Sequence, residues 1–121
     1  IEAFQRGGGA GKPMFLQAQI SYAPTDAEAR EGAYHQWRTN ILPSHVSANL
    51  TTPAQFDAIA QFVQMEDIEG KFRISSSIQQ HVDWIQQDIE LGFERIFLHN
   101  LNREQRRFIE VFGEKVLPAF I

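Results

Sequence analysis

Cysteine is absent from the 121 residues of the chain. This absence excludes disulfide bridges, thiolate zinc sites and cysteine nucleophiles together, and it is compatible with a reducing cytoplasm. The chain also lacks an apolar run approaching the roughly twenty residues that cross a bilayer, and it opens on no signal-peptide pattern. We therefore expect a soluble, cytoplasmic protein with no membrane partner.

Positive charge is scarce as well, with 11 Lys and Arg against 15 Asp and Glu and a formal net charge of -4. The basic residues are scattered, so they form no electrostatic footprint for phosphate backbones, and a nucleic-acid partner is not expected. The 43% of apolar residues and the ten Phe are instead typical of a globular domain with one core.

Hydrophobic periodicity predicts three strands and four helices in alternating order. The strands are expected at residues 14–22, 72–75 and 95–99, and the helices at about 26–38, 53–65, 78–91 and 103–117. Capping-box residues precede the helices, with Thr25 and Glu28 as the clearest pair. Residues 40–52 have no sustained period and are interpreted as an excursion loop. Residues 1–6 are typical of the last turns of a helix, so we expect the chain to be a portion of a longer protein.

Strand–helix alternation favours an α/β fold of parallel strands joined by right-handed crossovers. Such strands form either an open, doubly wound sheet or a closed barrel. Three strands alone leave two unprotected edges, which a protein has to cover, pair or close. The pattern therefore implies further sequence or a second copy of the chain.

The alternation within each strand predicts that polar side chains gather on one face of the sheet. On that face we expect polar residues from all three strands: Gln17, Gln19, Ser21, Arg73, Ser75 and His99. In a barrel this face is the lumen, where polar groups need hydrogen-bond partners. A ligand cavity and an internal polar network both satisfy that need.

Familiar ligand motifs are missing from the chain. The glycine-rich loop at residues 7–13 departs from the phosphate-binding pattern at Arg6 and Pro13, and Lys12 breaks the dinucleotide fingerprint. The four histidines lack the spacings of zinc sites, so no metal is expected. His99 differs from the other three because it ends a predicted strand, where barrels place their reactive groups.

Several segments together give the chain a resemblance to the luciferase-like family of flavin-dependent oxidoreductases. They are residues 80–85, the turn at 91–93, the strand end at 97–100, the tail at 105–118 and, more weakly, residues 11–22, 26–29 and Trp37. The resemblance implies the C-terminal portion of a TIM-type (β/α) barrel. Residues 1–121 would then be a single partial domain, comprising the last three strand–helix units.

The resemblance also implies a cofactor, either FMN or the related deazaflavin, at the C-terminal mouth, with hydride transfer or oxygen activation on a small-molecule substrate. We expect His99 to be catalytic, and Gln19, Ser21, Arg73 and Ser75 to lie at the cofactor. The chain alone would be inactive, and it would act with a missing N-terminal half or as a homo-oligomer. Two alternatives stay open: a non-catalytic half-barrel that self-associates through its sheet edges, and a small open-sheet binding domain whose polar strand face is covered by a helix.

Overall fold

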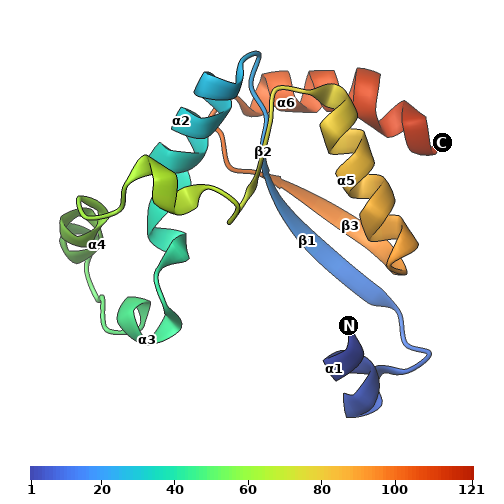
Figure 1. The fold of residues 1–121 in the computed structure, drawn as a ribbon, viewed down its shortest axis with the longest axis horizontal. Coiled ribbons are helices and arrows are strands. Elements are labelled where there is room, and N and C mark those ends of the chain that lie inside the picture. Colours follow the sequence, from blue (N-terminus) through green and yellow to red (C-terminus); the bar gives the residue numbers. More distant parts are fainter.

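A computed structural model describes residues 1–121 and contains one parallel sheet of three strands (Figure 1). The strands are β1 (Met14–Ser21), β2 (Arg73–Ile74) and β3 (Phe93–Asn100), and their order across the sheet is β2-β1-β3. The two long strands therefore pair directly with each other. The short β2 meets only the C-terminal end of β1, at Ile20 and Ser21.

Six α-helices accompany the sheet. Their bounds are α1 (Glu2–Phe4), α2 (Asp26–Trp37), α3 (Ser44–Ser47), α4 (Pro53–Ala60), α5 (Ile78–Glu90) and α6 (Gln105–Val111). Shorter 3-10 turns span Arg38–Ile41, Met65–Ile68 and Leu117–Phe120, and π-helical segments span Gln5–Gly9 and Phe112–Val116. In Figure 1, α5 lies beside the long strands and the C-terminal helical run crosses near the first turns of α5, whereas α2, α3 and α4 stand beyond the C-terminal ends of the strands.

One face of the sheet carries the main hydrophobic cluster. Ala18 and Ile20 of β1 pack with Ile85 of α5 and with Phe112 and Val116 of the C-terminal run. Leu16, Ile96 and Leu98 join them from the same face of β1 and β3. The alternation expected from the sequence is confirmed for these two strands, because these alternate residues of each strand share the face that the helices cover.

A second cluster fills the space between α2, the Met65–Ile68 turn and the ends of the strands. Its buried members are Ala33, Val63, Ile68 and Leu101, and Phe72 and Ile74 pack against them. Because Arg73 pairs in register with Ile20, whose side chain faces α5, its side chain lies on the helix-covered face of the sheet. The expected alternation of the second strand is therefore wrong by one residue.

Local capping signals set the helix starts. Thr25 and Glu28 form a reciprocal capping box at α2, Thr52 and Gln55 form another at α4, and the Ser77 hydroxyl accepts from the Gln80 backbone N–H at α5. Beyond α5, Gly92 has φ of 92°, a left-handed conformation that glycine adopts without steric cost.

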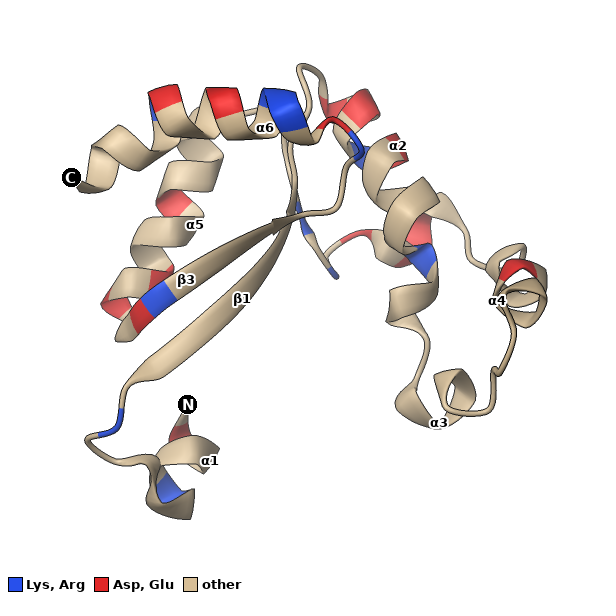
Figure 2. Ribbon diagram, turned by 180° about the vertical axis from the view of Figure 1, so that it is seen from behind, with Lys and Arg blue, Asp and Glu red and all other residues tan.

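Burial is modest for a chain of this length, since 18 of the 121 residues are buried. One sheet face is covered by helices, while the other is left largely open along β1 and β3. Basic and acidic residues are interspersed along the helices, the loops and the start of β3 (Figure 2). No helix combines the length and apolar character needed to span a bilayer.

Candidate functional site

The open face of the sheet brings a histidine, an amide and an indole together near the C-terminal ends of the long strands. Gln17 Nε2 lies 3.2 Å from His99 Nδ1. The ring of Trp37, in the last turn of α2, meets the His99 ring edge to face, with centroids 4.8 Å apart and planes at 90°. Three separate elements thus hold the imidazole of His99.

Strand register explains how this group assembles. Gln19 is the Cα partner of His99, and Gln17 is the partner of Phe97, so all four side chains lie on one face of paired strands. The sequence alone predicted this face for Gln17, Gln19 and His99. Trp37 was missed as a neighbour of His99, because only the tertiary position of α2 brings it over the strand end.

Aromatic and polar surface alternate along this open face. Gln17 and Gln19 are exposed, and Phe15 and Phe97 are 54% and 57% exposed. The Arg95 guanidinium stacks over the Phe15 ring at 5.4 Å. Such a surface can hold a planar ring against the Phe side chains and donate hydrogen bonds to its oxygens from the amides.

Ser21 and Ser75 lie away from this open surface. Ser21 is fully buried, and its hydroxyl donates to the Ala29 carbonyl of α2 at 2.7 Å. The Ser75 hydroxyl accepts from the Ser77 backbone N–H, and the Ser75 carbonyl is 2.9 Å from His81 Nε2. Both serines hold the α2 and α5 helices to the strand ends.

Arg73 makes a bidentate ion pair with Asp88 of α5, at 2.5 and 2.8 Å. Asp88 is buried, whereas about a third of the Arg73 side chain is exposed. The hydrogen bond from Arg73 to this carboxylate raises the pKa of Arg73 above its ordinary value, so the residue stays charged. The expected position of Arg73 on the same sheet face as His99 is wrong, since the guanidinium points to α5.

A cavity of about 480 Å³ runs along the edge of β1 that β2 leaves unpaired. Its walls include Gln17, Gln19, Phe72, Arg73 and Trp84. The cavity therefore joins two of the residues expected at a cofactor, Gln19 and Arg73, around the strand edge even though they face opposite sides of the sheet.

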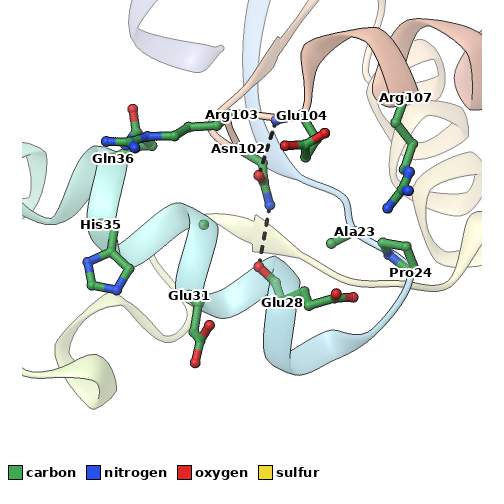
Figure 3. A pocket seen from close by; sticks show the side chains of 11 residues that line it. Ala23, Pro24, Glu28, Glu31, His35, Gln36, Asn102, Arg103, Glu104 and Arg107 are labelled. Atoms are coloured by element: carbon green, nitrogen blue, oxygen red, sulfur yellow. Dashed lines mark hydrogen bonds between the residues drawn. The ribbon is translucent and has the colours of Figure 1, made fainter.

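Another cavity, of about 510 Å³, lies between α2 and the start of α6 (Figure 3). Asn102 closes its floor by donating to the Glu28 carbonyl at 3.3 Å and accepting from the Glu104 backbone N–H at 3.4 Å. Glu31, His35, Arg103 and Arg107 also line it. Charged residues from the segment after β3 therefore converge here with charged residues of α2.

Comparison with known proteins gives similarities to enzymes that use the cofactor F420. The chain is 26% identical over 105 residues to an F420-dependent glucose-6-phosphate dehydrogenase of Beutenbergia cavernae, covering 87% of this chain and 31% of the relative. The corresponding enzyme of Microbacterium testaceum is 24% identical over 103 residues, which cover 85% of this chain and 30% of the relative. The chain thus spans about a third of the length of these curated relatives. No family model matches it.

Among solved structures, an F420-dependent secondary alcohol dehydrogenase in complex with an F420-acetone adduct has the same fold over nearly the whole chain. The superposition has a TM-score of 0.76 at 20% sequence identity and covers 99% of this chain and 36% of that one. The expected fold class, parallel strand–helix units forming part of a TIM-type barrel, is confirmed.

Proposed function

We propose that the chain contributes part of the cofactor and substrate cavity of a deazaflavin-dependent oxidoreductase of the luciferase-like family. The observation that carries the proposal is the open face of β1 and β3, where exposed Gln17, Gln19 and Phe97 surround His99. The carboxyl ends of barrel strands are where enzymes of this architecture bind their ligands. The F420-dependent relatives support a deazaflavin instead of FMN, and dehydrogenation instead of oxygen activation.

The residues present fit such a cofactor. A deazaflavin offers a flat ring system edged with carbonyl oxygens, for which Phe97 provides apolar surface and Gln19 provides an amide donor. When bound, a deazaflavin would supply the hydride acceptor for a substrate carbon that bears a hydroxyl, and the hydroxyl proton would pass to water. His99 would hydrogen-bond the reacting region of the ligand.

The other predicted residues enter the proposal through their observed positions. Arg73 lines the edge cavity with Gln19 and would present positive potential there to an anionic part of the ligand, while Asp88 holds its guanidinium in place. Ser21 and Ser75 would shape the mouth by fixing α2 and α5 to the strand ends.

Fluorescence titration of the full-length gene product with F420, and separately with FMN, tests the proposal. We expect F420 fluorescence to be quenched on binding, and His99→Ala to weaken binding about two- to tenfold, the loss of one hydrogen bond. Gln86→Ala, on the solvent side of α5, is the matched control and should bind as the unmodified protein does. Unchanged fluorescence with both cofactors would contradict the proposal.

A second function is favoured by the exposed aromatic surface. Phe15 and Phe97 leave apolar area on a sheet face that no element of the chain covers, and β1 has an unpaired edge, so a non-catalytic half-barrel could self-associate there. Solution mass discriminates the two, because a cofactor-free oligomer supports association, whereas a folded monomer without bound cofactor argues against both.

A further inference from the structure

We propose that Gln17 is a positioning residue that fixes the tautomer of His99, so that the neutral imidazole presents Nε2–H as a hydrogen-bond donor. The inference deepens the proposed function and rests on it only for the identity of the ligand that His99 contacts. Its basis is the 3.2 Å contact between Gln17 Nε2 and His99 Nδ1.

The chemistry of the two atoms determines the tautomer. A carboxamide nitrogen carries two hydrogens and accepts none, so Nδ1 of His99 has to be the acceptor and cannot carry a proton. In a neutral imidazole the single proton then resides on Nε2. Nε2 makes no hydrogen bond within the chain, so it is left for a ligand.

The surroundings keep the ring in this orientation. The edge-to-face contact with Trp37 restrains rotation of the imidazole on one side. On the strand, Gln17 and His99 occupy diagonal positions of the same face, since Gln17 pairs with Phe97 and Gln19 with His99. This spacing is within reach of a glutamine side chain.

This tautomer allows His99 to act as a hydrogen-bond donor at Nε2 and excludes it as a proton acceptor at the same atom. A neutral ring that donates from Nε2 can bind an oxygen acceptor of the ligand, such as a carbonyl or alkoxide oxygen, and stabilise negative charge on it. The same ring cannot take a proton at Nε2. We therefore assign His99 as a donor to oxygen instead of a general base.

Nitrogen-15 NMR of the histidine-labelled protein at about pH 8, where imidazole is neutral, tests the inference directly. His99→Gln identifies the His99 signals by their disappearance. We expect the shift pattern of an unprotonated Nδ1 and a protonated Nε2. The opposite pattern, or the averaged pattern of two exchanging tautomers, would overturn the proposal.

A charge-changing variant gives the second measurement. Gln17→Glu replaces the donor with a carboxylate, so Nδ1 should become protonated and its signal should move to the protonated range. Gln61→Glu makes the same change at the exposed end of α4 and should leave the His99 signals unchanged. An unaltered His99 pattern in Gln17→Glu would contradict the role of Gln17. Both NMR measurements are made without cofactor, so a failure of F420 binding is distinguishable from a failure of this inference.

Discussion

His81 is the most confined titratable side chain of the chain, with 1% of its surface exposed. Its ring packs against the rings of Tyr22, Trp84 and Phe112, with centroids 5.2 to 5.9 Å apart. Nε2 donates to the Ser75 carbonyl, whereas Nδ1 is buried with no partner. Burial lowers the pKa of His81 and the nearby Arg73 charge lowers it further, while the hydrogen bond to Ser75 acts in the opposite direction.

This environment predicts a loss of stability in mild acid. The unfolded chain gains a proton at His81 near the ordinary value of 6.5, whereas the folded chain resists it until the pH falls to the lowered pKa. The contribution of neutral His81 to the free energy of unfolding is thus complete above about pH 6.5 and declines below it, by at most about 1.4 kcal/mol per pH unit.

Urea unfolding of the protein between about pH 7.5 and 5 measures this effect. His81→Phe should flatten the decline, and the matched change at exposed His45, to Phe, should leave it in place. An equally steep decline in the His81 variant would show that other groups cause it.

The sheet face expected for each side chain was correct in the two long strands. Gln17, Gln19 and His99 were placed on one face by alternation in two eight-residue strands, and the structure puts them there. Arg73 was misplaced because β2 has only two residues, too few for alternation to define a face. Its orientation follows from pairing with Ile20 and from the carboxylate of Asp88, neither of which is visible in the local sequence.

At the scale of elements, the close contact between α2 and the loop after β3 depends on Gly32. A methyl group at Gly32 would clash with Nδ2 of Asn102, whose side chain is buried and hydrogen-bonded to Glu28 and Glu104. The absence of a side chain at this position lets Asn102 tie the two elements together.

Gly32→Ala should therefore destabilise the protein by about 1–2 kcal/mol, because Asn102 has to give up its hydrogen bonds. Gly113→Ala is the matched control, since nothing lies within 4 Å of the added methyl group. In Gly113→Ala the gain in helix propensity should raise the free energy of unfolding by up to about 1 kcal/mol. Thermal unfolding measures both, and equal stability of the two variants would contradict the account of Gly32.

Helix starts were predictable from sequence, whereas some helix ends were not. The capping box at Thr25 depends on two residues three positions apart and formed as expected, and Thr52 with Gln55 forms a box of the same spacing. The second helix was expected to reach residue 65 but ends at Ala60, since Val63 packs into the cluster with Ala33 and Ile68. The last helix was expected to begin near residue 103 but begins at Gln105, and the Asn102 amide bonds across to α2. The excursion loop at 40–52 contains the short helix α3.

For the whole molecule, the strand order could not be derived from the alternation of strands and helices. That alternation is compatible with several orders, and the direct pairing of β1 with β3 depends on contacts between residues about 80 positions apart. The resulting sheet has a helix-covered face and an open face. The open face, with Phe15, Phe97 and His99, is the feature that the proposed function assigns to a ligand cavity.

Site-directed thiol labelling tests this claim most directly, because these 121 residues contribute no cysteine and any cysteine outside them can be replaced beforehand. In the full-length gene product, a thiol introduced by Phe97→Cys should be labelled more slowly with F420 than without it. The expected decrease in the labelling rate is roughly tenfold at a cofactor concentration ten times Kd. A thiol at Ile109→Cys, exposed on the outer helix α6, should react equally fast with and without F420. Undiminished labelling at position 97 under saturating F420 would contradict the assignment of the open face to the cofactor cavity.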